Sequence, residues 1–144
     1  MGTYLSHVGI CVSDLDRSIR FYCEGLGFEP AESFEVGDEF AALMEMDSVR
    51  LRSQFLRRDG HAIELLSFGH PEPGGERTRR PVNTYGMTHL SFRVDDVDEV
   101  AALVEALGGT VHTETRTTMA DGAMDFVYCS DPDGTRVELM RIPS

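Results

Sequence analysis

Residues 6–16 read SHVGICVSDLD, and 82 residues further on, residues 88–98 read THLSFRVDDVD. The histidine, the apolar positions and both aspartates coincide in the two stretches. Residues 59–65 (DGHAIEL) match residues 133–139 (DGTRVEL) at a shift of 74, so the second copy lacks eight residues in its middle. Because self-similarity of this kind indicates a repeated structural unit, the chain is predicted to contain two half-size modules.

Each copy is predicted to fold as strand, helix and three strands, which is an α+β fold. Apolar residues alternate with others near residues 8–12 and 90–94, as in a half-buried strand. Asp14 or Asp16 can cap the first helix, and the Gly108-Gly109 pair can end the second. The expected elements after these first strands are helices near 15–26 and 98–107, and strands at 28–36, 39–46, 49–57, 62–68, 110–116, 125–130 and 135–142.

The domain organisation follows from the repeat. Residues 1–144 are expected to form one domain, with modules 1–68 and 87–144. The intervening residues 69–86 are rich in proline and glycine, which suits a connector.

The composition limits the classes of function. A hydrophobic fraction of 41% with 26% charged residues is typical of a globular protein. The net charge of −12 disfavours nucleic acid, which needs a basic face. Arg77, Arg79 and Arg80 form the basic cluster of the connector, either as a solvated linker or as a contact to an anionic substrate tail. No apolar stretch spans a bilayer and no signal peptide is recognised, so we expect no membrane partner and a cytoplasmic location.

The cysteines do not suggest covalent or metal chemistry. Cys11, Cys23 and Cys129 are odd in number and widely spaced, so neither a disulfide framework nor a cysteine zinc site is expected. Cys11 and Cys129 lie in apolar, strand-like runs and are expected to be small buried hydrophobic residues.

Four titratable residues fall at equivalent positions of the two copies. The repeat aligns His7 with His89 and Glu64 with Glu138. Strand alternation directs the neighbouring branched residues toward the helix and these four side chains toward the opposite face. Two imidazoles and two carboxylates suit a borderline divalent cation with room for water or substrate oxygens.

Each of these residues also has a simpler interpretation. A single histidine in an apolar strand is often only hydrogen-bonded, and a single glutamate near a strand end often faces solvent. The metal-site interpretation depends on the histidine and the glutamate occurring together in both copies. It also depends on charge, because two buried carboxylates without a cation would be strongly unfavourable. The remaining histidines have no counterpart in the other copy and are expected at the surface: His61, His70 and His112.

The chain resembles the vicinal-oxygen-chelate (glyoxalase-like) superfamily over essentially its whole length. Residues 14–22 (DLDRSIRFY), 25–28 (GLGF), 131–134 (DPDG) and 138–139 (EL) carry the resemblance. It implies a curved, partly open mixed sheet around a metal site. The superfamily includes glyoxalase I, methylmalonyl-CoA epimerase, fosfomycin-resistance proteins, extradiol dioxygenases and bleomycin-binding proteins, so the resemblance specifies a fold more closely than a reaction.

The resemblance also implies a ligand set and a type of chemistry. The metal ligands would be His7, Glu64, His89 and Glu138, a set most similar to that of bacterial glyoxalase I; the similar epimerases usually carry glutamine at the second position. The implied cofactor is one divalent ion (Ni, Co, Zn, Mn or Fe) that polarises a carbonyl of a small-molecule substrate. Glu138 or Glu64 would remove a carbon-bound proton, as in a lyase or isomerase, and analogy favours Glu138.

Two other functions stay open on the same residues. One is an Fe(II)-dependent extradiol-type dioxygenase, and the other is a small-molecule (antibiotic) binding resistance protein. Superfamily members of this size are usually dimers, and exposed sheet edges invite a partner, so a homodimer is expected.

Overall fold

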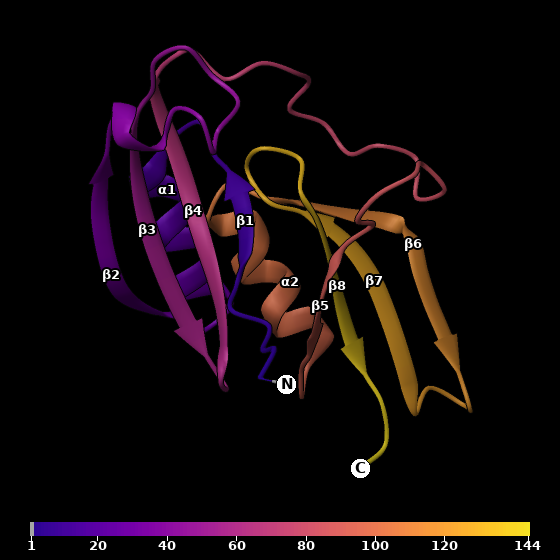
Figure 1. Cartoon of the computed structure of the whole chain (residues 1–144). Coiled ribbons are helices and arrows are strands. Elements are labelled where there is room, and N and C mark those ends of the chain that lie inside the picture. The colour runs from indigo at the N-terminus through magenta and orange to yellow at the C-terminus, as the bar shows by residue number, and fades with distance from the viewer. Residues whose placement is uncertain (1) are drawn as a thin grey trace. The chain divides into compact units, whose positions relative to one another are not determined.

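The computed structural model describes residues 2–144, which divide into two compact units. Unit 1 comprises residues 2–23 and Gly27–Gly75, and unit 2 comprises Glu24–Leu26 and Glu76–Ser144. Each unit contains a four-stranded mixed sheet, and strand, helix and three strands follow one another in both halves of the chain (Figure 1). The predicted α+β fold with two repeated modules is confirmed.

The sheet of unit 1 has the strand order β1-β4-β3-β2. β1 is parallel to β4, and the other neighbours are antiparallel. The elements of the first half of the chain are β1 (Val8–Cys11), α1 (Leu15–Arg20), the π-helical turn η1 (Phe21–Gly25), β2 (Glu29–Val36), the 3-10 turn η2 (Asp38–Phe40), β3 (Arg50–Arg58) and β4 (His61–His70).

The sheet of unit 2 repeats this topology with the order β5-β8-β7-β6. β5 is parallel to β8, and β6, β7 and β8 are antiparallel neighbours. The elements are β5 (Leu90–Arg93), α2 (Val97–Ala106), β6 (Thr110–Met119), β7 (Met124–Ser130) and β8 (Arg136–Arg141). None of the helices in residues 2–144 is both long and apolar enough to cross a membrane.

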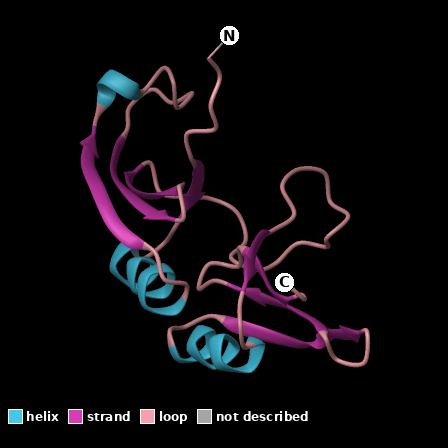
Figure 2. Cartoon of the chain, turned by 90° about the horizontal axis from the view of Figure 1, so that it is seen from below, coloured by secondary structure: helices cyan, strands magenta, loops and turns pink. Residues whose placement is uncertain are grey.

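Strand alternation gives each sheet one buried face. Ile10 of β1 and Leu65 of β4 are buried, whereas Gly9 is exposed and Glu64 is only partly buried. In each half of the chain the helix lies along one face of its sheet (Figure 2). The glutamate and its neighbours on the other face are therefore left for contacts outside the core.

Aspartates cap both helices, as was expected for the first. The Asp14 side chain accepts a hydrogen bond from the backbone N–H of Arg17 (3.0 Å), and Asp96 accepts from the N–H groups of Asp98 and Glu99. These carboxylates satisfy N–H groups that have no partner within the first helical turn. Asp14, and not Asp16, is the cap of α1.

The strand predicted at 39–46 is wrong: the chain there forms η2 and a series of turns. Asp38 accepts hydrogen bonds from the Ser48 hydroxyl (2.8 Å) and the Val49 N–H (2.9 Å), which closes the segment into a loop. These hydrogen bonds hold the pKa of Asp38 below its usual value. Ala41, Met44 and Met46 of the segment therefore pack into a local cluster with Val49 and Leu51 instead of joining the sheet.

Two other expectations require correction. Cys129 is buried, but Cys11 is exposed, because it follows the buried Ile10 and so lies on the opposite face of β1. His112 is half-buried, not at the surface like His61 and His70; its Nε2 is hydrogen-bonded to the Ser130 hydroxyl (2.7 Å). Burial lowers the pKa of His112, and the Arg79 cation lowers it further.

Two arginines of the connector form ion pairs with carboxylates of unit 2. Arg77 donates to Asp133 (2.7 Å) and Arg79 donates to Glu114 (2.5 Å). The Glu114 pKa is lowered by a backbone hydrogen bond and by Arg79. These two ion pairs hold the connector against the sheet, so it is not simply a solvated linker.

Candidate metal centre

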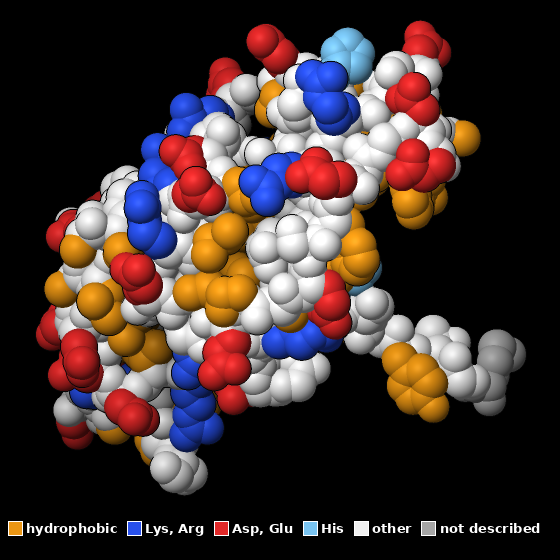
Figure 3. Space-filling model, turned by 90° about the vertical axis from the view of Figure 1, so that its left-hand side faces the viewer, with side chains coloured by type: hydrophobic (Ala, Val, Ile, Leu, Met, Phe, Trp, Pro, Cys, Tyr) orange, Lys and Arg blue, Asp and Glu red, His pale blue; other side chains and the backbone are white. Residues whose placement is uncertain are grey.

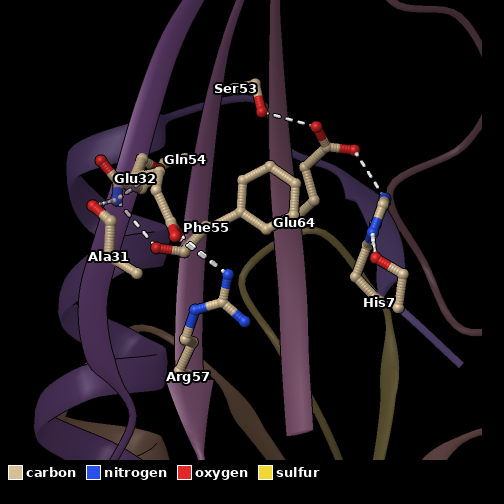
Figure 4. A network of polar contacts seen from close by, with 9 residues as sticks. His7, Ala31, Glu32, Ser53, Gln54, Phe55, Arg57 and Glu64 are labelled. Atoms are coloured by element: carbon tan, nitrogen blue, oxygen red, sulfur yellow. Dashed lines mark hydrogen bonds and ion pairs between the residues drawn. The ribbon is translucent and has the colours of Figure 1, made fainter. Parts of the chain in front are cut away.

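The first histidine–glutamate pair lies within unit 1. His7 precedes β1, and the parallel register places Gly9 beside Glu64 of β4. His7 Nε2 lies 3.4 Å from Glu64 Oε1, and the other ring nitrogen, Nδ1, is hydrogen-bonded to the Ser6 hydroxyl (2.8 Å). Ser53 of β3 donates to Glu64 Oε2 (2.5 Å), so the carboxylate lies between Ser53 and His7 (Figure 4).

The second pair has the same arrangement within unit 2. His89 Nε2 lies 3.7 Å from Glu138 Oε1, and its Nδ1 is hydrogen-bonded to the Thr88 hydroxyl (2.8 Å). Ser91 of β5 donates to Glu138 Oε1 (2.7 Å). The hydroxyl group of the residue before each histidine thus fixes the ring so that Nε2 faces the glutamate.

An aromatic ring lies against each imidazole, which the sequence did not reveal. The ring centroids are 4.9 Å apart for His7 and Phe55, and 5.4 Å apart for His89 and Tyr128, both edge to face. Each aromatic residue is directly opposite its glutamate in the antiparallel register. Such contacts limit the rotation of the imidazole and so help to position Nε2.

The donor atoms in each pair suit a cation. When Nδ1 carries the proton, Nε2 presents a lone pair toward the carboxylate, and two such acceptors at 3.4 or 3.7 Å need a cation between or beside them. Neighbouring ligands about 2.1 Å from a divalent ion are about 3.0–3.4 Å apart in octahedral or tetrahedral arrangements. The donor types suit a divalent cation; the separation in the His7–Glu64 pair lies at the upper end of this range, and that in the His89–Glu138 pair exceeds it by 0.3 Å.

Within each compact unit, the structure places one histidine and one glutamate of the four predicted ligands side by side. Within residues 2–144 there is no group of three or more His, Cys, Asp or Glu side chains that could hold a metal ion. Instead there are two pairs, one in each compact unit. A single centre built from His7, Glu64, His89 and Glu138 stays a prediction.

The two glutamates differ in their surroundings. Ser53 of unit 1 occupies the position that Phe126 occupies in unit 2, two residues before the aromatic residue opposite the glutamate. Conversely, Ser91 occupies the position of Gly9, beside the glutamate in the parallel register. The serine that holds each glutamate thus comes from a middle strand in unit 1 and from an edge strand in unit 2.

A cavity of about 280 Å³ lies beside Glu138. It is formed within unit 2 on the sheet face that carries the glutamate. Its lining residues are Thr115, Thr117, Met119, Phe126, Val127, Tyr128 and Glu138. Glu138 is therefore in contact with space that a small molecule can occupy.

Arg136 supports the His89 side of the arrangement from within β8. It is 9% exposed, and its guanidinium donates to the backbone carbonyls of Arg80 and Thr88. Its Cζ lies 5.3 Å from the centroid of the Tyr128 ring. Arg136 therefore contacts Thr88 and Tyr128, two of the residues that contact the His89 ring. An arginine within an apolar strand was the sequence signal for this role, and it was missed.

The surface charge is mixed where Figure 3 shows it. Acidic and basic side chains are interspersed on that face, with hydrophobic side chains between them. That face has no broad area of basic side chains of the kind that binds a phosphate backbone.

Comparison with known proteins assigns the family. The model of the Glyoxalase/Bleomycin resistance protein/Dioxygenase superfamily matches residues 4–139. The chain belongs to this superfamily.

Three relatives match nearly the whole chain. The uncharacterized protein YaeR of Escherichia coli is 35% identical and is covered to 92%, as is this chain. A 2-epi-5-epi-valiolone epimerase of Actinomyces is 28% identical, over 96% of this chain and 79% of its own length. A probable lactoylglutathione lyase of Vibrio parahaemolyticus is 28% identical, over 94% of this chain and 88% of its own. The relatives with a named activity are thus an isomerase and a lyase.

Solved structures share the fold. A glyoxalase family protein from Bacillus cereus superposes with a TM-score of 0.82 at 23% identity, over 95% of this chain and 92% of that one. The fosfomycin resistance protein FosX from Listeria monocytogenes, in complex with Mn(II) and sulfate, has a TM-score of 0.62 at 21% identity, over 99% and 95% of the two chains.

Proposed function

We propose that this protein is a divalent-metal-dependent lyase or isomerase that moves a carbon-bound proton next to a carbonyl group. The observation that carries the proposal is the doubled histidine–glutamate pair, in which each imidazole is fixed by a hydroxyl group and faces a carboxylate. The epimerase and lyase among the relatives support this class of reaction.

His7, Glu64, His89 and Glu138 would together hold one cation (Ni, Co, Zn, Mn or Fe). When bound, the cation supplies a positive charge that polarises the substrate carbonyl and makes the neighbouring C–H bond more acidic. The imidazoles serve as neutral ligands, and the hydroxyl groups of Ser6 and Thr88 hold them in place.

Glu138 is the better candidate for the base. It lines the cavity, and among residues 2–144 no side chain donates a hydrogen bond to its Oε2. Glu64, in contrast, directs Oε1 toward His7 and accepts the Ser53 hydroxyl at Oε2. Glu138 would take the carbon-bound proton while the electron pair of that bond moves toward the carbonyl. Return of the proton to the adjacent carbon, or to the other face of the same carbon, completes an isomerisation or an epimerisation.

The test compares Glu138→Gln with Glu64→Gln. We expect Glu138→Gln to abolish deuterium exchange into hemithioacetal and thioester substrates while it retains bound metal, since the amide oxygen can coordinate but accepts no proton at neutral pH. Glu64→Gln should keep both the metal and measurable exchange. The measurements are NMR detection of exchange in deuterated water and metal analysis of each purified variant.

The outcomes separate the assignments. Exchange that survives in Glu138→Gln and disappears in Glu64→Gln would reverse the roles of the two glutamates. Full exchange in both variants would rule out proton transfer by either residue. Oxygen uptake with catechols under Fe(II) would instead indicate the dioxygenase alternative.

A further inference from the structure

The two units differ in which strand supplies the serine that donates to the glutamate, and this difference affects the shape of the cavity beside Glu138. In unit 1, Ser53 fills the position next to the glutamate with a small hydroxyl side chain that is itself committed to Glu64. In unit 2, Ser91 provides that hydroxyl from β5, and the corresponding position on β7 carries Phe126. Moving the serine to the edge strand leaves the Phe126 ring available to form a wall of the cavity beside Glu138.

The rest of the cavity wall is largely apolar. Met119 and Tyr128 lie beside Phe126 in the lining. Two threonines contribute hydroxyl groups, but both donate to backbone carbonyls: Thr115 to His112 (2.7 Å) and Thr117 to Thr115 (3.0 Å). The Thr115 hydroxyl also accepts the N–H of Tyr128 (2.8 Å). The cavity therefore offers ring, thioether and methyl surface and few polar groups with free hydrogen-bonding capacity.

The cavity has no cationic side chain in its lining. The arginines of unit 2 are hydrogen-bonded elsewhere: Arg77, Arg79 and Arg116 to carboxylates, and Arg80, Arg93, Arg136 and Arg141 to backbone carbonyls. The chain contains no lysine and has a net charge of −12. A carboxylate or phosphate placed in this cavity would gain no ion pair and would lie beside the negatively charged Glu138, which is unfavourable.

We propose that the cavity binds an uncharged, apolar group of the substrate, such as a phenyl ring or a short hydrocarbon chain, attached next to the reacting carbonyl. Phe126 determines this preference. The inference rests on the proposed function, since Glu138 and the cation must hold the reacting end of the same molecule. It separates this chain from an enzyme whose substrate places a charged peptide tail in this position.

The test uses hydroxamates, which chelate a cation through two vicinal oxygens and differ only in their tails. The probes are acetohydroxamate, benzohydroxamate and 4-carboxybenzohydroxamate, bound to the Ni²⁺-loaded protein by isothermal titration calorimetry. Each Kd is referred to the affinity of that hydroxamate for free Ni²⁺. We expect the Kd of benzohydroxamate, referred in this way, to be lower than that of either other probe by about 10-fold or more.

Variants assign the preference to one residue. Phe126→Ser, which installs the residue of the equivalent position in unit 1, should reduce the advantage of benzohydroxamate over acetohydroxamate to about twofold or less. Phe126→Leu, a smaller change in volume, should reduce it partly and serves if the serine variant does not fold. Leu103→Ser, at an exposed position of α2, is the control and should leave the advantage unchanged.

The failures are distinguishable. If the protein binds no Ni²⁺, or binds hydroxamates equally without it, the proposed function is wrong. If hydroxamate binding requires Ni²⁺ but the three probes bind equally, or the carboxylated probe binds best, only the present inference is wrong. If Phe126→Ser keeps the full advantage of benzohydroxamate, Phe126 is not the determinant.

Discussion

Gly134 shows how a single residue ties the connector to the second sheet. It lies in the turn between β7 and β8 with φ +92°, and the backbone of Thr78 is 2.7 Å from the position that a Cβ atom would take. Gly134→Ala therefore meets a left-handed backbone and a main-chain clash together. We expect it to lower the free energy of unfolding by about 2–4 kcal/mol, measured by urea denaturation.

Gly60 is the matched control for this prediction. It lies in the turn between β3 and β4 with φ +77°, but nothing is within 4 Å of the position of its Cβ. Gly60→Ala should therefore cost only the backbone term, about 1 kcal/mol. Equal losses for the two alanine variants would show that the contact with Thr78 contributes nothing.

Ion pairs of one arginine join β6 to β7 and to α2 in unit 2. Arg116 of β6 donates to Asp125 of β7 through both Nε and Nη2 (2.5 Å each), and to Asp98 at the start of α2 (2.8 Å). Asp125 is 4% exposed, whereas the Asp98 side chain is 83% exposed. The hydrogen bond from Arg116 holds the pKa of Asp125 below its usual value.

A lowered folded-state pKa makes this contribution to stability depend on pH. The contribution is complete above the unfolded-state pKa of about 4 and is lost as the pH falls through the lower pKa of the folded state. Asp125→Asn should lower the free energy of unfolding by about 2 kcal/mol at pH 7. The gap between wild type and variant should narrow progressively below about pH 4, as measured by urea denaturation at a series of pH values.

Asp98→Asn is the control, because an ion pair with an exposed carboxylate contributes about 0–1 kcal/mol. Other carboxylates, such as Asp38 and Glu114, also have lowered pKa values, so the wild-type protein loses stability in acid for several reasons. Only the difference between wild type and Asp125→Asn reports on this pair. A difference that stays constant with pH would contradict the assignment.

The segment 39–46 marks the limit of prediction at the scale of elements. Its apolar residues suggested another strand, but η2 and turns occupy it. The loop is closed by hydrogen bonds that the Asp38 carboxylate accepts from the Ser48 hydroxyl and the Val49 N–H, and all three residues lie outside the segment. A local pattern of apolar residues does not distinguish packing in a sheet from packing in a small cluster.

At the scale of the whole molecule, the proposal of one shared cation has a measurable consequence. If ligands from both units hold a single ion, Ni²⁺ should bind with a stoichiometry of one per chain. His7→Ala and His89→Ala should each weaken that same event by about 10-fold or more, because each removes one ligand of the same ion. Calorimetric titration of the metal-free protein with Ni²⁺ measures both quantities.

His61→Ala is the control, since His61 is exposed at the start of β4 and is not one of the four proposed ligands. Two ions per chain would show that each histidine–glutamate pair binds by itself. An unchanged Kd in either His7→Ala or His89→Ala would remove that histidine from the ligand set.

The sequence by itself determined the repeat, most of the strands and the equivalence of His7 with His89 and of Glu64 with Glu138 on the face opposite the helices. These features follow from patterns within short segments, since alternation along a strand decides which face each residue occupies. The tertiary structure decided the rest: that Ser53 and Ser91 hold the two glutamates from different strands, and that Phe126 forms a wall of the cavity. These contacts depend on strand order and register, which bring together residues far apart in the chain and leave no local pattern in the sequence.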